Sequence, residues 1–275
     1  MMALQYVVKT FRRDLQSYLQ LQDDLQRFDC ANIRLCVPVD DLAAFSRIVA
    51  ADVELVSSEQ VLASFGFHRV LPESWYSQQL LKLLLVASST VETCWVLDAN
   101  TILLRPPPRA HDDGGRIVLS CDRPTEEDRQ WYASSARFLG MPISGPRMAA
   151  VNQPLSRKAV RALLRFVAVR TRCHPVYALA GSMLIGQFRR EPVWTEFGLY
   201  RSFATHVLPA LHRFSKVRRT VYYRHEIEGR AFDQWLYQVN ERRPAMVKVY
   251  ARRPTGAIPP TRLSAICDRI RRASR

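Results

Sequence analysis

The 275-residue sequence lacks several features that would place it in a common class of protein. Glycine is scarce, with 10 residues in the whole chain, which excludes collagen-like repeats and glycine-rich linkers. No uninterrupted apolar run approaches the roughly 18 residues that a spanning helix needs, so we expect no transmembrane helix. The apolar stretch near the N-terminus is too short for a signal peptide and its charges lie on the wrong side, which predicts a cytoplasmic protein.

Cysteine pairs and catalytic signatures are also missing. No two of the six cysteines have a C-x-x-C or zinc-ligand spacing, so we expect small buried hydrophobic residues and no disulfide framework. The glycine-rich dinucleotide fingerprint, the phosphate loop, the G-x-S-x-G elbow and the H-E-x-x-H motif do not occur. The cysteines are Cys30, Cys36, Cys94, Cys121, Cys173 and Cys267.

Acidic residues are few in the second half of the chain. Residues 1–137 hold 14 Lys+Arg and 18 Asp+Glu, whereas residues 138–275 hold 26 and 7, so the net charges are −4 and +19. Only five of the cations are lysines, and arginine forks suit phosphate. Such a half attracts phosphate, nucleic acid or an anionic membrane surface. A solvated basic surface without a ligand would have the same composition.

The apolar patterns alternate between strands and helices, which predicts a three-layer α/β domain. Asp14 is a plausible N-cap of the first helix. We expect the segment 173–192 to be short and irregular. Strands are expected at 4–10, 32–39, 53–56, 93–97, 116–121 and 219–225, and helices at 14–28, 40–50, 74–88, 125–139, 154–170, 194–208 and 261–273.

The helix expected over 74–88 has leucines on nearly every face and should be buried. Its polar residues Gln78, Gln79 and Lys82 share one stripe with Trp75, at helical spacing. A polar stripe on a buried helix indicates a ligand or partner on that side. The alternative is a stripe that faces solvent beside the sheet.

A carboxylate follows the most apolar strand. The segment 93–97 is apolar on both faces, as is typical of a central parallel strand, and Asp98 falls at its carboxyl end, where open α/β sheets bind ligands. Asp98-Ala99-Asn100 offers oxygen ligands that suit a hard divalent cation, which would neutralise a diphosphate leaving group. An aspartate that only caps a turn would explain the same residues.

Two runs, W-Y-S-Q-Q-L-L-K-L at 75–83 and W-V-L-D-A-N-T-I-L-L-R-P at 95–106, resemble GT-A glycosyltransferases. The chain is most similar to an uncharacterised bacterial branch of glycosyltransferase-like proteins. The opening YVVKTFRRDL, the segment VPVDDLAAF and the run W-T-E-F-G-L-Y at 194–200 fit the same pattern. The resemblance covers roughly residues 5–205.

The resemblance implies a GT-A-like three-layer sandwich, with a mixed, mostly parallel sheet and helices on both faces. It also implies a nucleotide-diphosphate-sugar donor, Mn²⁺ or Mg²⁺, and an acceptor glycan or small molecule with a free hydroxyl. We expect one domain over 1–275, with a nucleotide-binding half at 1–140. The basic acceptor-side half at 141–275 would end in the C-terminal helix.

The family's D-x-D motif corresponds to Asp98 and Asn100, which would be the metal ligands. Asn100 departs from the motif and supplies a neutral oxygen, which should weaken metal affinity. Relatives often place a histidine in the segment matching 151–158, and VNQPLSRK has none. The donor would be bound by Gln78, Gln79, Lys82, Asp98, Lys9 and Thr10.

Glu196 lies in the run that matches the family's acidic motif, and we expect it to be the catalytic base for the acceptor hydroxyl. The alternative is a structural ion pair with Arg201 or another cation. His225 and Glu226 are further candidates for a metal ligand or base.

A second hypothesis is a catalytically impaired nucleotide-sugar-binding protein, or a basic module on an anionic polymer or membrane surface. No recognised nucleic-acid motif occurs, so we expect no specific nucleic-acid binding. Peripheral contact with the inner membrane face, through the basic C-terminal half, is compatible with the charge distribution.

Overall fold

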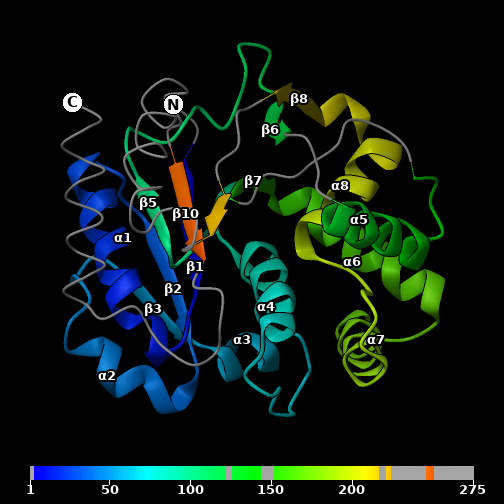
Figure 1. Ribbon diagram of the computed structural model, residues 1–275, viewed down its shortest axis with the longest axis horizontal. Helices are drawn as coiled ribbons and strands as arrows, with labels where there is room; N and C mark the ends of the chain where they lie inside the picture. Colours follow the sequence, from blue (N-terminus) through cyan, green and yellow to red (C-terminus); the bar gives the residue numbers. More distant parts are fainter. Residues whose placement is uncertain (1–2, 122–125, 144–151, 217–220, 224–245, 251–275) are drawn as a thin grey trace.

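The computed structural model describes residues 3–121, 126–143, 152–216, 221–223 and 246–250 (Figure 1). Its centre is a five-stranded sheet with the order β3-β2-β1-β4-β7. Four strands are parallel, and β7 runs antiparallel to β4, so the expected mixed, mostly parallel sheet is confirmed. The strands are β1 (Leu4–Lys9), β2 (Ile33–Val37), β3 (Glu54–Ser57), β4 (Thr93–Asp98) and β7 (Gln153–Ser156).

Helices cover both faces of this sheet because its central strands are apolar on both sides (Figure 1). Along β1, Tyr6 and Val8 pack in one buried cluster and Val7 in the other, as the two-residue period of a strand requires. The first cluster includes residues of α1 (Leu15–Arg27) and α2 (Leu42–Ser46). The second includes residues of α3 (Ser58–Ser64) and α4 (Trp75–Ser88).

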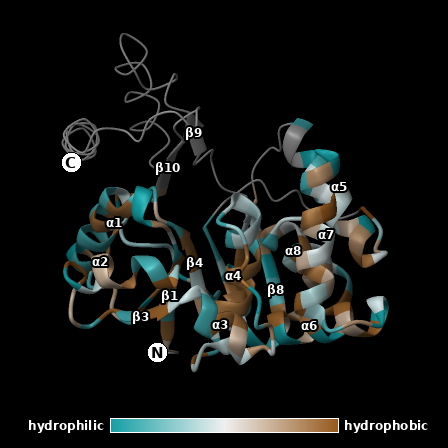
Figure 2. Ribbon diagram, turned by 90° about the horizontal axis from the view of Figure 1, so that it is seen from below, coloured by the Kyte–Doolittle hydropathy of each residue, from teal (hydrophilic) through white to brown (hydrophobic). Residues whose placement is uncertain are grey.

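The helical layer beyond α4 is thick, since four more helices contribute to the second cluster. Figure 2 shows this group beside α4, on the side away from α1 and α2. It consists of α5 (Glu126–Leu139), α6 (Arg157–Thr171), α7 (Pro175–Arg189) and α8 (Glu196–Val207). None of the described helices is long and apolar enough to cross a membrane.

Two small sheets complete the described part of the chain. In one, β10 (Met246–Tyr250) pairs with β5 (Thr101–Leu103) and with β9 (Val221–Tyr223). In the other, β6 (Ile117–Cys121) pairs in parallel with β8 (His212–Lys216), so β6 does not extend the main sheet. Single 3₁₀ turns lie at η1 (Arg12–Asp14), η2 (Val39–Asp41) and η3 (Pro209–Leu211).

Most expected elements are confirmed within a few residues, and the exceptions are instructive. The helix expected over 40–50 is reduced to η2 and the five-residue α2, and α3 was not predicted. Asp14 sits at the N-cap of α1 but its side chain makes no capping hydrogen bond. The helix expected over 261–273 and the candidates His225 and Glu226 lie outside the described residues.

The helix expected to begin at residue 154 begins at Arg157 instead. Residues 153–156 form β7, in which Pro154 pairs with Trp95 of β4. A proline is tolerated there because β7 is an edge strand. Ser156 then caps α6 by accepting a hydrogen bond from the backbone N–H of Ala159 at 3.0 Å.

The expectation of irregular structure over 173–192 is wrong, because α7 fills most of that segment. Two features hid the helix from the sequence pattern. Large apolar residues lie on its exposed side, and Gly186 interrupts it. A Cβ at Gly186 would lie 1.9 Å from a methyl carbon of Val193, so the glycine is required by close packing.

Candidate active site

The site lies where the strand order changes direction. From β1 the chain proceeds to β2 and β3 on one side, and β4 then adds on the other side of β1. Lys9 and Asp98, the last residues of β1 and β4, are register partners. Ligands of open α/β sheets bind at such a switch point, beyond the carboxyl ends of the strands. The predicted residues Lys9, Thr10 and Asp98 therefore share one edge.

Three charged residues from separate elements meet next to this edge. The ammonium of Lys82, on α4, donates a hydrogen bond to Asp98 Oδ1 and a second, of 3.0 Å, to Glu196 Oε1 at the start of α8. Lys82 is 1% exposed, Glu196 2% and Asp98 9%. We call these three residues the ionic centre. All three were predicted from the sequence as site residues, and the structure brings them together.

The ionic centre holds two carboxylates against one ammonium. Burial alone would lower the pKa of Lys82, but attraction by Asp98 and then by Glu196 outweighs it, so the pKa lies above its ordinary value. Burial raises the pKa of Glu196, and the charge of Lys82 opposes that shift only in part. Lys82 is therefore a cation at neutral pH, and Glu196 binds a proton more readily than a surface glutamate does.

Glu196 is also fixed through its backbone. Gln79, one helical turn before Lys82, accepts a hydrogen bond of 3.4 Å from the Glu196 N–H. Thr195 caps α8, and its own N–H donates to Ser135 Oγ of α5 at 3.1 Å. The start of α8 is thus held from α4 and from α5.

Asn152 is a positioning residue that the sequence analysis did not identify. Its Oδ1 accepts the Asp98 N–H at 2.9 Å, and its amide group donates to Thr101 Oγ1 at 3.0 Å. It lies in the left-handed region, with φ of 63°, which asparagine tolerates better than most residues. The turn that carries Asp98 and Asn100 is held across 54 residues of chain, so no local pattern could have shown it.

The other end of that turn is anchored by α1. Asp24 Oδ2 accepts the Leu103 N–H at 3.0 Å, and Arg27 donates to the Leu103 carbonyl at 2.6 Å. Asp24 and Arg27 also form an ion pair of 3.2 Å. The segment 98–103 is therefore fixed at both ends.

At the end of β1, Lys9 is 2% exposed and its ammonium donates to the Thr10 carbonyl at 2.6 Å. The ammonium also lies 3.9 Å from the centre of the Phe11 ring. Burial lowers the pKa of Lys9 to about 8. Thr10 Oγ1 is buried and has no hydrogen-bond partner among the described residues. An unsatisfied hydroxyl beside a lysine that loses its proton near pH 8 is an arrangement common at binding sites.

The structure decides between alternatives that the sequence left open, first for the helix stripe and then for Glu196. The alternative in which the stripe faces solvent is wrong for Gln79 and Lys82, which are buried, while Gln78 is half-buried and Trp75 partly exposed. The alternative that Glu196 forms an ion pair with Arg201 or another cation holds for another cation, Lys82, and not for Arg201. Arg201 lies over the Tyr132 ring, 5.2 Å from its centre.

A divalent cation would find a small donor set here. Asp98 already pairs with an ammonium, Asn100 is neutral, and the described residues contain no group of three His, Cys, Asp or Glu side chains that could hold a metal. Hard cations take six or more oxygens, and Mg²⁺ is often held by one or two protein oxygens plus substrate phosphates. Within the described part of the chain, Asp98 and Asn100 fit a metal only if a bound diphosphate supplies further oxygens.

A family model described as "Family of unknown function (DUF6492)" matches residues 14–226, which is more than half of the chain. The chain belongs to this family. The DUF6492 description assigns no activity, and no curated protein sequence matches the chain.

Solved structures similar to this DUF6492 chain include glycosyltransferases. An active-site variant of LgtC has a TM-score of 0.51 and 11% identity, over 96% of this chain and 95% of that one. The galactosyltransferase LgtC with donor and acceptor sugar analogs has a TM-score of 0.49 and 13% identity over the same shares. Glucosyl-3-phosphoglycerate synthase from Mycobacterium tuberculosis, with Mn²⁺, UDP-glucose and phosphoglyceric acid, has a TM-score of 0.42 and 12% identity, over 99% of this chain and 78% of that one. The fold is that of the GT-A glycosyltransferases, as expected.

Proposed function

We propose that the chain transfers a sugar from a nucleotide-diphosphate-sugar donor to a hydroxyl group of a glycan or other acceptor. The observation that carries this proposal is the ionic centre, buried beside the switch point of a GT-A fold. Burying an ammonium with two carboxylates is a poor way to gain stability, since apolar residues of similar volume are often as good or better. Perturbed charged groups beside a ligand edge are typical of functional sites.

The donor diphosphate would bind at the carboxyl ends of β1 and β4. When the bond between the anomeric carbon and the phosphate oxygen breaks, negative charge grows on the leaving diphosphate. The ammonium groups of Lys82 and Lys9 are the buried cations at this edge that can stabilise it. A metal held by Asp98, Asn100 and the diphosphate would add to this charge stabilisation.

Glu196 is the proposed base. Its carboxylate is occupied by Lys82 before the donor arrives. Donor phosphates compete for that ammonium and release the Glu196 carboxylate. Glu196 then accepts the proton of the acceptor hydroxyl while the hydroxyl oxygen bonds to the anomeric carbon. The raised pKa of Glu196 favours this proton transfer.

A nucleotide-sugar-binding protein without catalysis is the second candidate. Asn100 in place of an acidic ligand, and the pairing of Asp98 with Lys82, favour it. It predicts the same donor binding without transfer or hydrolysis, so the two candidates differ in turnover and not in affinity.

Peripheral contact with an anionic membrane is a separate part of the proposal. On α7, Leu184, Ile185 and Phe188 are 51%, 56% and 90% exposed, and Arg189 and Arg190 follow them. Apolar residues next to arginines match a surface of anionic headgroups over acyl chains. A cytoplasmic location remains a prediction.

Sedimentation with phosphatidylserine vesicles tests this contact. The double substitution L184S/F188S should reduce binding, whereas the control V169S, at an exposed valine of α6, should retain it. Equal binding of the wild type and the double variant would contradict a role for α7.

The catalytic proposal is tested first by thermal shift with UDP, GDP, CDP, ADP and their sugars, each with and without Mn²⁺. A ligand that binds only the native state raises the melting temperature. Release of free nucleoside diphosphate from the donor that binds is then measured for the wild type, for Asp98→Asn and for the exposed control Asp23→Asn.

We expect the wild type and the Asp23 variant to show both the nucleotide-dependent rise in melting temperature and the release of nucleoside diphosphate. The Asp98 variant should show neither. Binding without turnover in the wild type would favour the second candidate. No shift with any nucleotide, or full turnover in a folded Asp98 variant, would refute the proposed site.

A further inference from the structure

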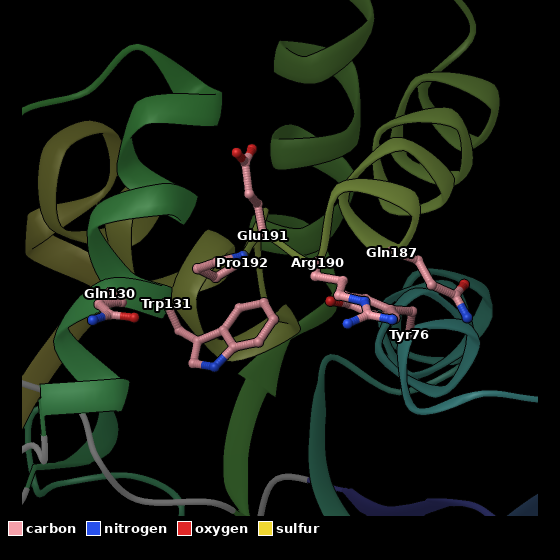
Figure 3. A pocket seen from close by; sticks show the side chains of 7 residues that line it. All are labelled: Tyr76, Gln130, Trp131, Gln187, Arg190, Glu191 and Pro192. Atoms are coloured by element: carbon pink, nitrogen blue, oxygen red, sulfur yellow. The ribbon is translucent and has the colours of Figure 1, made fainter.

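A cavity of about 380 Å³ lies between α4, α5 and the C-terminal end of α7. This volume is in the range of ligand pockets. In Figure 3 the indole of Trp131 is in the middle of the pocket, and Tyr76 and Arg190 lie next to each other across from it. The pocket has played no part in the function described so far.

Trp131 and Tyr76 are the aromatic residues of the lining. The Trp131 ring lies 6.1 Å from Tyr76 and 5.0 Å from Trp75, which is itself 38% exposed. The three rings pack against one another at angles between 57° and 73°, so the Trp131 indole is supported from α4. Such a supported ring offers a flat, electron-rich face to a ligand.

The rest of the lining consists of Pro192 and four polar side chains that together carry no net charge. Gln130 and Gln187 bring two amide groups, while Arg190 and Glu191 bring one positive and one negative charge. The four side chains can donate and accept several hydrogen bonds. A phosphorylated ligand gains nothing from a lining whose charges cancel, whereas a neutral polyhydroxyl compound can use every one of these groups.

The pocket is joined to the ionic centre through three elements. On α4, Tyr76 precedes Lys82 by six residues, which is about 9 Å along a helix. On α5, the Trp131 carbonyl accepts the hydroxyl of Ser135 at 2.8 Å, and this hydroxyl accepts the Thr195 N–H. The segment that follows Arg190 in the pocket leads directly into α8 and Glu196.

We infer that this cavity is a subsite for a neutral sugar ring of the acceptor, stacked on Trp131 and held through its hydroxyls by Gln130, Gln187 and Glu191. The C–H bonds on one face of a pyranose carry partial positive charge and suit the negative face of an indole. The assignment to an acceptor rests on the proposed transferase function. The assignment to a neutral sugar rests on the pocket alone.

Saccharide binding without nucleotide tests the pocket by itself. The probes are lactose, maltose, cellobiose and chitobiose, with glucose 6-phosphate as the anionic comparison. Their binding is measured by saturation-transfer NMR and by tryptophan fluorescence. We expect at least one neutral disaccharide to bind, and Trp131→Ala to weaken its binding about tenfold or more. Trp131→Phe should retain part of the affinity, and the control Val70→Ala, at an exposed residue outside the lining, should retain all of it.

Loss of folding in the Trp131 variant would not block the test. Gln130 and Gln187 are exposed, so Q130A/Q187A keeps the core intact and should weaken the same disaccharide severalfold. The pocket proposal is refuted if no neutral saccharide binds the wild type, or if the folded variants bind as the wild type does. Nucleotide thermal shifts on the same variants separate the two proposals. Saccharide binding without any nucleotide binding would support the sugar subsite and refute the proposed transferase function.

Discussion

Replacing the cation of the ionic centre and replacing one of its anions should have very different effects on the stability of the protein. Lys82→Met leaves Asp98 and Glu196 facing each other without the ammonium that both now contact. Like charges roughly 4–6 Å apart repel by about 3–4 kcal/mol at an effective dielectric constant near 20. Removing one partner of a buried pair typically costs about 3–5 kcal/mol. For a chain of this size we expect the melting temperature to fall by roughly 6–20 °C.

Glu196→Gln keeps the shape and an acceptor oxygen for Lys82, and it removes the excess negative charge. We therefore expect a free energy of unfolding within about 1 kcal/mol of the wild type, together with loss of transfer. The pKa of Glu196 is raised in the native state, so the native state holds that proton more tightly than the unfolded chain does. Ionising Glu196 thus costs stability, and this cost is absent in the glutamine variant.

The sign of the pH dependence follows. At a pH below the ordinary pKa of glutamate, the wild type and the Glu196 variant should have equal stability relative to their own unfolded chains. At a pH above the raised pKa of Glu196, the free energy of unfolding of the variant should exceed that of the wild type. Urea unfolding of both proteins between pH 4 and 8 measures this difference. If Glu196→Gln destabilises the protein as strongly as Lys82→Met, Glu196 is a needed structural partner of Lys82 and the reasoning fails.

Three further outcomes follow from other parts of the site. The pKa of Lys9 is about 8, so affinity for a nucleoside diphosphate should fall as pH rises through 8, and Lys9→Met should abolish that fall in a titration from pH 7 to 9.5. Asn100→Asp adds an anionic ligand and should strengthen the Mn²⁺-dependent part of the nucleotide thermal shift; an unchanged metal response would exclude Asn100 from a metal site. Tyr200→Phe removes a buried hydroxyl that accepts the Ser156 N–H at 2.8 Å, and should lower the free energy of unfolding by about 1–3 kcal/mol with nucleotide binding unchanged.

The sequence predicted the site best where one chemical feature stood against a uniform background. Lys82 is a cation on a helix of leucines, Asp98 ends a strand with apolar faces, and Glu196 is one of seven acidic residues in the second half of the chain. In each case a charge in an apolar or basic setting requires a partner. What the pattern could not show is that the three are one another's partners, because the contact joins positions 114 residues apart.

Errors in the fold have a similar origin. The start of α6 was misplaced because Pro154 and Ser156 are as suitable for a helix N-terminus as for an edge strand. Only the pairing of β7 with β4 distinguishes the two, and that pairing is not local. The helix α7 was missed because several of its large apolar residues are exposed and its Gly186 packs closely against Val193, so the expected periodicity is broken.

The position of Lys82 indicates what kind of site this is. A lysine needed only to neutralise Asp98 could lie at the surface, where desolvation is small. Here the ammonium is taken out of water, and the second carboxylate leaves the group with a net negative charge. Such a group attracts a further cation less strongly than a pair of free carboxylates would, and a diphosphate can contact the Lys82 ammonium only by displacing a carboxylate from it. Because the diphosphate adds negative charge next to Lys82, its binding is favoured when Glu196 becomes protonated at the same step. In the proposed reaction, the proton that Glu196 gains is the one that the acceptor hydroxyl loses, so donor binding would be coupled to activation of the acceptor.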